Sequence, residues 1–257
     1  MMIPPSAQSG LARYAAALHD TLPEAVSGIY LLGSIALGDF QPTSSDIDFV
    51  TLVRRALTAA EIDGLRVLHT TLRADFPACR FSGSYLQAGD LGRDAADRPP
   101  GPYYHDAELR IGHHDENAVS WWLLANRHVT LFEAEPLDFS YEMDWERFSA
   151  AMRENLATYW TQFRRPSRIG WLLTDSGVMW VVLGVLRPWY SIREHAISSK
   201  TEAGEYGLQH LPEPFHPIVG EALRLRRGTG SPGYRSRLTR ATDAHRLLRT
   251  ILSTTAV

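Results

Sequence analysis

The chain has 257 residues, which is long enough for one large domain or two small ones, and 44% of them are hydrophobic. A formal net charge of −3 gives no general reason to expect binding to nucleic acid or to an anionic membrane. The single cysteine, Cys79, excludes an intrachain disulfide and favours a reducing cytoplasm, and MMIPPSAQSG lacks the pattern of a signal peptide.

The first part of the chain alternates between patterns typical of helices and of strands. Amphipathic spacing or capping residues predict helices over residues 10–22, 58–76 and 116–129. Short apolar runs predict strands over residues 27–33, 46–53 and 80–87. Frequent Gly, Pro and Asp predict an irregular loop over residues 88–116, and a strand with a linker follows the third helix.

From about residue 141 the pattern becomes helical throughout. Five segments have this character: residues 144–165, 176–195, 200–211, 215–228 and 237–252. Pro188 lies inside the second of them and predicts that this helix kinks or ends there. We therefore expect an α/β domain over residues 1–140 and an all-helical domain over residues 141–257.

The most informative stretch is YLLGSIALGDFQPTSSDIDFV, residues 30–50. Asp46 and Asp48 are two residues apart on a predicted strand, so both side chains project from one face. Paired carboxylates repel each other, and Mg²⁺ relieves the repulsion while leaving coordination sites for substrate phosphates. The Gly33-Ser34 turn offers close backbone approach, N–H groups and a hydroxyl to a phosphate. Each motif alone is common, but together they predict transfer from a nucleoside triphosphate.

These motifs also resemble a known family. Gly33-Ser34 with Asp46-Ile47-Asp48 resembles the signature of the polymerase-β-type nucleotidyltransferase superfamily, and GSIALGDFQPTSSDIDFV resembles the aminoglycoside adenylyltransferases that modify streptomycin and spectinomycin. A second stretch, residues 180–223, resembles the C-terminal helical domain of those enzymes. The resemblance implies an α/β N-terminal nucleotidyltransferase domain with a small mixed sheet, plus an all-α C-terminal helical bundle.

The resemblance further implies Mg²⁺-dependent transfer of AMP from ATP to a hydroxyl of an aminoglycoside or aminocyclitol antibiotic, with release of pyrophosphate. By position, Gly33 and Ser34 would hold the terminal phosphates, Asp46 and Asp48 would bind Mg²⁺, and Lys200 would reach the triphosphate. Lys200 is the only lysine among the 26 basic residues, which favours a site that needs a compact point charge. The alternative is a surface lysine near the start of a helix.

One expected group has no counterpart in the sequence. Enzymes of this family carry a third carboxylate, the general base, on the strand equivalent to residues 80–87, but this strand has no acid and Ser82 lies nearest the position. Three explanations are open. The base is supplied by the following segment, the alignment is shifted, or the enzyme is weak, altered in substrate or inactive. The acids of that segment are Asp90, Glu108, Asp115 and Glu116. We favour Glu116, although the helix dipole alone also favours an acid there.

The incomplete match leaves two other functions open. The first is that of a nucleotidyltransferase that acts on a different small hydroxyl compound. The second is that of a catalytically weak nucleotide-binding regulatory protein that has lost its base. Asp175 lies where the family places residues that contact the substrate, with Trp171 and Trp180 on either side. The surrounding sequence, RRPSRIGWLLTD, has three arginines and one aspartate, which argues against a highly cationic acceptor.

Two further patterns are interpreted as structural. His113-His114, followed by Asp115-Glu116, lacks the spacing of a zinc site and predicts an exposed polar loop. The last helix is rich in arginine but has no interleaved aromatic residues, so a solvated helix face is favoured over an RNA-binding surface. Its arginines are Arg235, Arg237, Arg240, Arg246 and Arg249.

Overall fold

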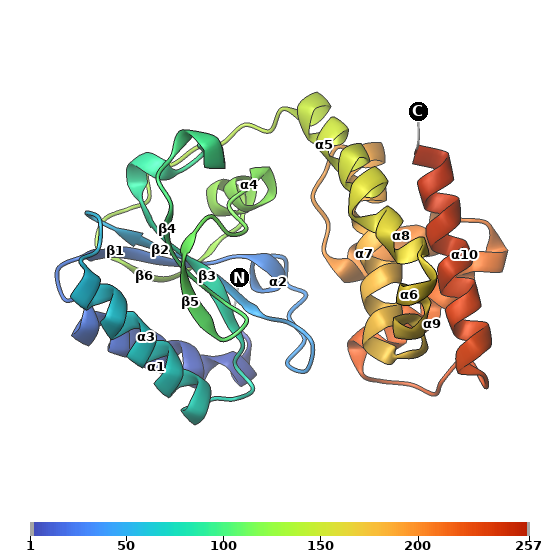
Figure 1. Ribbon diagram of the computed structural model, residues 1–257, viewed down its shortest axis with the longest axis horizontal. Helices are drawn as coiled ribbons and strands as arrows, with labels where there is room; N and C mark the ends of the chain where they lie inside the picture. The colour runs from blue at the N-terminus through green and yellow to red at the C-terminus, as the bar shows by residue number, and fades with distance from the viewer. Residues whose placement is uncertain (1–2, 256–257) are drawn as a thin grey trace. The chain divides into compact units, whose positions relative to one another are not determined.

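The computed structural model describes residues 3–255, and the chain divides into two compact units, Met1–Met143 and Asp144–Val257 (Figure 1). The first unit contains one six-stranded sheet with the strand order β5-β4-β3-β2-β1-β6. Its strands are β1 (Val26–Leu31), β2 (Ile47–Val53), β3 (Phe81–Gln87), β4 (Gly101–His105), β5 (Glu108–Gly112) and β6 (Val129–Glu133). β2 and β3 pair in parallel, while the other neighbours are antiparallel, so the predicted small mixed sheet is confirmed.

The helices of this unit are α1 (Pro5–Thr21), α2 (Gly33–Ala36), α3 (Ala59–Asp75) and α4 (Ala118–Asn126). α1 and α3 lie side by side on one face of the sheet, where their leucines and Tyr14 join the buried core (Figure 1). The capping box predicted for α3 is present, because Thr58 Oγ1 accepts from the N–H of Glu61 and the Glu61 carboxylate accepts from the N–H of Thr58. Burial of this apolar layer against the sheet is the main force that holds the unit together.

β4 and β5 form a hairpin within the segment that the sequence predicted as an irregular loop, so that prediction is wrong. Asp106 and Ala107 form the turn with φ of 49° and 64°, and His105 pairs with Glu108 across it. Two central residues with positive φ give the turn whose twist matches a hairpin. Neither residue is glycine and several prolines precede the hairpin, which is why the composition pointed to a loop.

The parallel pairing of β2 with β3 sets the position of the polar residues on these strands. Asp48 is the direct partner of Ser82, and Phe49 is the partner of Gly83. A methyl group on Gly83 would lie 2.0 Å from the carbonyl oxygen of Phe49, so only glycine allows this close approach. Directly paired residues point to the same face of a sheet, which places the Asp48 and Ser82 side chains next to each other.

The second unit is the predicted all-helical bundle. Its main helices are α5 (Trp145–Thr158), α7 (Asp175–Glu194), α8 (Lys200–His210), α9 (His216–Arg227) and α10 (Arg237–Thr255), with a short α6 (Pro166–Ile169). α7 packs against the other four main helices and supplies much of the buried core, including Val181, Val182 and Leu186. Within residues 3–255 no helix is long and apolar enough to cross a membrane.

We predicted that α7 kinks or ends at Pro188. The helix does not end there, because it continues to Glu194. Proline removes one backbone hydrogen bond of the helix, to the carbonyl of residue 184. Pro188 is itself buried, and the ring of Trp160 packs so closely on Gly184 that a methyl group there would lie 2.2 Å from it.

Candidate active site

The turn between β1 and α2 packs directly on a carboxylate of β2. Gly33 has a φ of +53°, in the left-handed region that side chains disfavour. The N–H of Leu32 donates to the carbonyl of Asp48 at 2.9 Å and ties the turn to β2. A methyl group on Gly33 would lie 1.7 Å from Asp48 Oδ2, so both the conformation and the space require glycine.

Ser34, the next residue, presents a hydroxyl that the described part of the chain leaves without a hydrogen-bond partner although its oxygen is buried. An unsatisfied buried polar group costs about 1–3 kcal/mol, so such atoms commonly mark the place of a missing ligand atom. The orphaned hydroxyl of Ser34 and the turn without a side chain at Gly33 are features that suit a bound phosphate. The residues present therefore fit a nucleotide with its metal.

Asp46 immediately precedes β2, and its Oδ1 accepts a hydrogen bond of 2.8 Å from Arg80 Nε. Both side chains are about half exposed, and such exposed pairs contribute at most about 1 kcal/mol, so a divalent cation can replace the guanidinium. No group of three or more His, Cys, Asp or Glu side chains suited to a metal occurs within residues 3–255. The two carboxylates of Asp46 and Asp48 would instead suit Mg²⁺, which completes its coordination with phosphate oxygens and water. The close approach of the Asp46 and Asp48 carboxylates stays a prediction.

Ser82, beside Asp48 in the sheet, is hydrogen-bonded to two imidazoles. Its Oγ lies 3.1 Å from His105 Nδ1 and 3.0 Å from His114 Nε2. His105 ends β4 and His114 follows β5, so the unpredicted hairpin delivers both rings to Ser82. The expectation of an exposed polar loop is correct for His113 but wrong for His114, whose side chain is 12% exposed.

Glu116, the predicted base, is engaged in a buried ion pair. Its Oε2 lies 2.6 Å from Arg98 Nη2, with the two side chains 4% and 1% exposed. The hydroxyl of Ser84 and the N–H of His114 also donate to the carboxylate. Burial alone raises the pKa of Glu116, but these hydrogen bonds and the charge of Arg98 outweigh it and hold the pKa below its ordinary value. Catalysis by Glu116 stays a prediction, and these contacts weigh against it.

In the helical unit, Lys200 is the first residue of α8, which Ser199 and Glu202 cap. Its ammonium lies over the ring of Trp180, 4.9 Å from the centroid. A cation at a helix N-terminus is opposed by the helix dipole, so helix stability does not explain this lysine. Its contact with the aromatic face holds the charge in a defined place.

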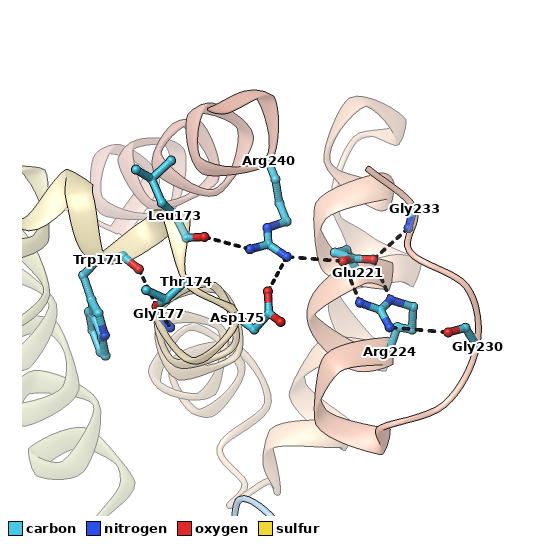
Figure 2. A network of polar contacts seen from close by, with 10 residues as sticks. All are labelled: Trp171, Leu173, Thr174, Asp175, Gly177, Glu221, Arg224, Gly230, Gly233 and Arg240. Carbon is cyan, nitrogen blue, oxygen red and sulfur yellow. Dashed lines mark hydrogen bonds and ion pairs between the residues drawn. The ribbon is translucent and has the colours of Figure 1, made fainter. Parts of the chain in front are cut away.

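Asp175, the predicted substrate residue, belongs to a network of ion pairs (Figure 2). Arg240 Nη1 lies 2.7 Å from Asp175 Oδ1 and 3.6 Å from Glu221 Oε1, and Arg240 Nη2 donates to the carbonyl of Leu173. Arg240 is 5% exposed, so the expectation of a solvated arginine face is wrong at this position. A cationic substrate would have to compete with Arg240 for Asp175, whose substrate role stays a prediction.

Comparisons with known proteins agree with these two units. Residues 12–76 match the family described as nucleotidyltransferase domain, and residues 144–249 match the family described as aminoglycoside adenylyltransferase, C-terminal domain. None of the curated proteins compared with the chain matches its sequence. Among solved structures, spectinomycin adenyltransferase AAD(9) from Enterococcus faecialis, with ATP and spectinomycin, is similar in fold. It has a TM-score of 0.65 at 13% identity, over 94% of this chain and 99% of that one.

The matched family and the Gly33 turn that packs on the Asp48 carboxylate define a nucleotidyltransferase. With its C-terminal helical domain, the chain belongs among the aminoglycoside adenylyltransferase-like nucleotidyltransferases.

The contacts of Glu116 predict a structural role that a stability measurement can detect. Glu116→Gln leaves Arg98 buried without its counter-charge, which typically costs about 3–5 kcal/mol of unfolding free energy. Glu108→Gln is the control, because its pair with Arg110 is exposed and should change stability by less than about 1 kcal/mol. Chemical denaturation of the two variants at pH 7 measures both effects, and equal stability of Glu116→Gln and wild type would refute the structural role.

The same substitution should remove a pH dependence. Because folding lowers the pKa of Glu116, its stabilising effect is fully present above the ordinary value of 4.5 and is lost as the pH falls through the lower folded value. The stability difference between wild type and Glu116→Gln should therefore shrink below about pH 4.5.

Proposed function

We propose that the protein transfers AMP from ATP to a hydroxyl of an aminoglycoside or aminocyclitol antibiotic, with Mg²⁺ as cofactor and release of pyrophosphate. The observation that carries the proposal is the contact of Gly33 with the Asp48 carboxylate, next to the orphaned hydroxyl of Ser34. The similar adenyltransferase AAD(9), whose structure holds ATP and spectinomycin, supports ATP and a drug of this kind as the substrates.

In this proposal Gly33 and Ser34 hold the terminal phosphates of ATP through backbone N–H groups and the free hydroxyl. Asp46 and Asp48 would hold Mg²⁺, which neutralises phosphate charge when it is bound. Lys200 adds its ammonium to the triphosphate. The acceptor oxygen forms a bond to the α-phosphorus while the bond to the pyrophosphate oxygen breaks, so the chain's main task is to orient both substrates in line.

The charge near Asp175 favours an acceptor of low positive charge. Its carboxylate already pairs with Arg240, and the segment before it is rich in arginine. We therefore expect spectinomycin to be a better acceptor than aminoglycosides with many amines. The acid-free strand β3 keeps two other candidates open, an enzyme for another small hydroxyl compound and a nucleotide-binding regulatory protein.

A screen for pyrophosphate release separates these functions. The protein is incubated with ATP and Mg²⁺ and, in separate reactions, with spectinomycin, streptomycin and a panel of other aminoglycosides. Acceptor-dependent release supports the proposal, and mass spectrometry should show the drug with one added adenylyl group. Tight ATP binding without release from any acceptor would instead favour the regulatory protein.

The two aspartates should be essential for turnover. Asp46→Asn and Asp48→Asn each keep the shape of the side chain but remove the charge that a divalent cation needs, so we expect loss of detectable pyrophosphate release. ATP binding should weaken only in the presence of Mg²⁺, as calorimetry with and without the metal can measure. Circular dichroism should show an intact fold, and normal turnover by either variant would contradict the metal site.

Lys200→Ala should raise the KM for ATP more than the KM for the acceptor. A hydrogen bond to a charged group contributes about 1.5–3 kcal/mol, which corresponds to a change of about 10- to 100-fold. Arg193→Ala is the matched control, because Arg193 lies over the ring of Trp189 in the same unit but has no proposed role. An unchanged KM for ATP in Lys200→Ala, measured by steady-state kinetics, would exclude the phosphate role.

A further inference from the structure

We propose that Ser82, His105 and His114 together form the general base of this enzyme, in place of the carboxylate that its strand β3 lacks. The hydroxyl of Ser82 takes the proton of the acceptor hydroxyl and passes its own proton to an imidazole. This inference rests on the proposed function, since it names the group that accepts the proton in that reaction.

The first support is the position of Ser82 in the sheet. Ser82 is the β3 residue directly paired with Asp48, and paired residues of adjacent strands project from the same face. A group on this side chain is therefore next to the carboxylate that faces Gly33. Ser82 is only 7% exposed, so its hydroxyl is shielded from bulk water as a proton carrier requires.

The second support is the hydrogen bonding of the hydroxyl. His105 Nδ1 and His114 Nε2 approach Ser82 Oγ at 3.1 Å and 3.0 Å. A hydroxyl has one proton to donate, and a neutral imidazole has one donor and one acceptor nitrogen. With both rings neutral, Ser82 donates to one nitrogen and accepts from the other, so an acceptor nitrogen is already hydrogen-bonded to the Ser82 proton.

The third support is the rigid placement of both rings. The ring of His114 stacks on Tyr103, with 5.1 Å between centroids and 7° between planes. Its backbone N–H donates to Glu116, which the buried Arg98 fixes in turn. His105 is held at the end of β4, with its ring centroid 4.5 Å from that of His114. Such placement from several sides is what proton transfer needs from a catalytic group.

Burial favours a His114 imidazole that is neutral before the reaction. Burial lowers the pKa of His114 below its ordinary value of 6.5, and the nearby His105 adds to this, while nearby acids oppose it. The titratable and charged groups that face the pair are Arg98, Tyr103, Asp106, Asp115 and Glu116. The Asp106 carboxylate lies 3.4 Å from His105 Nε2, and the Asp115 carboxylate lies 3.7 Å from His114 Nε2. Both carboxylates would stabilise the imidazolium that forms during the reaction.

The step is balanced without any further reactant. As the acceptor oxygen bonds to the α-phosphorus, the phosphorus–oxygen bond to pyrophosphate breaks. The acceptor proton moves to Ser82 Oγ, and the Ser82 proton moves to His105 Nδ1 or His114 Nε2. The imidazolium then loses this proton to solvent, and Ser82 returns to its starting state.

The central test is the double variant His105→Gln/His114→Gln, which keeps hydrogen-bonding side chains but removes the basic nitrogens. We expect kcat to fall at least about 100-fold, the lower end of the usual contribution of a general base, with the KM for ATP nearly unchanged. His113→Gln is the matched control, because His113 adjoins His114 in sequence and is exposed. A double variant with the wild-type kcat would overturn the proposal.

The pH dependence separates a base from a merely structural cluster. The wild-type kcat should be level at and above pH 6.5, the ordinary value of an imidazole, and should decrease at lower pH, because the pKa of His114 lies below that value. Ser82→Ala should lose both the rate and this pH dependence. It also serves as the deciding variant if circular dichroism shows that the double variant does not fold. Wild-type kcat in Ser82→Ala would overturn the relay.

A rescue experiment tests the position directly. Adding Ser82→Glu to the double variant supplies a carboxylate beside Asp48, and we expect it to recover at least about tenfold of the lost kcat. No recovery would show that residue 82 is not where the proton is taken. If wild type binds ATP but none of the acceptors supports pyrophosphate release, the proposed function fails instead. Turnover that does not depend on either histidine overturns only the present inference.

Discussion

The contact between Gly33 and the carboxylate of Asp48 is the constraint on which the site depends. It brings a backbone turn without a side chain directly against a negative charge, a placement that only glycine allows at this φ. The turn is held there by the N–H of Leu32, which donates to β2 at Asp48 itself. The antiparallel pairing of β1 with β2 and the helices behind the sheet therefore serve to fix one short stretch of backbone.

The same strand register determines how much negative charge lies beside Asp48. A third carboxylate at residue 82 would add a negative charge beside Asp48, whereas a hydroxyl with neutral imidazoles behind it adds none until a proton arrives. The acid of the neighbouring loop, Glu116, is instead neutralised by Arg98 and orders the backbone at His114. The hairpin and its loop thus supply the proton-accepting groups, while the buried ion pair supplies their support.

Much of the fold could be predicted because its signals are local. The capping box at Thr58 and Glu61, the apolar strands and the helical spacing after residue 141 each depend on a few neighbouring residues. The β4–β5 hairpin was missed because its turn, Asp106-Ala107, lacks glycine and its entry is rich in proline. The pairing of His114 with Ser82 and of Arg240 with Asp175 joins residues far apart in sequence, which no local pattern reveals.

The most direct test of the central claim is the affinity of Gly33→Ala for ATP in the presence of Mg²⁺, measured by isothermal titration calorimetry. Gly89→Ala is the control, since a methyl group there meets no atom within 4 Å. The account predicts that Gly33→Ala weakens binding at least about tenfold, because the added carbon forces the turn away from Asp48, while Gly89→Ala binds like wild type. Equal affinity of Gly33→Ala and wild type would contradict the assignment of this turn as the nucleotide site.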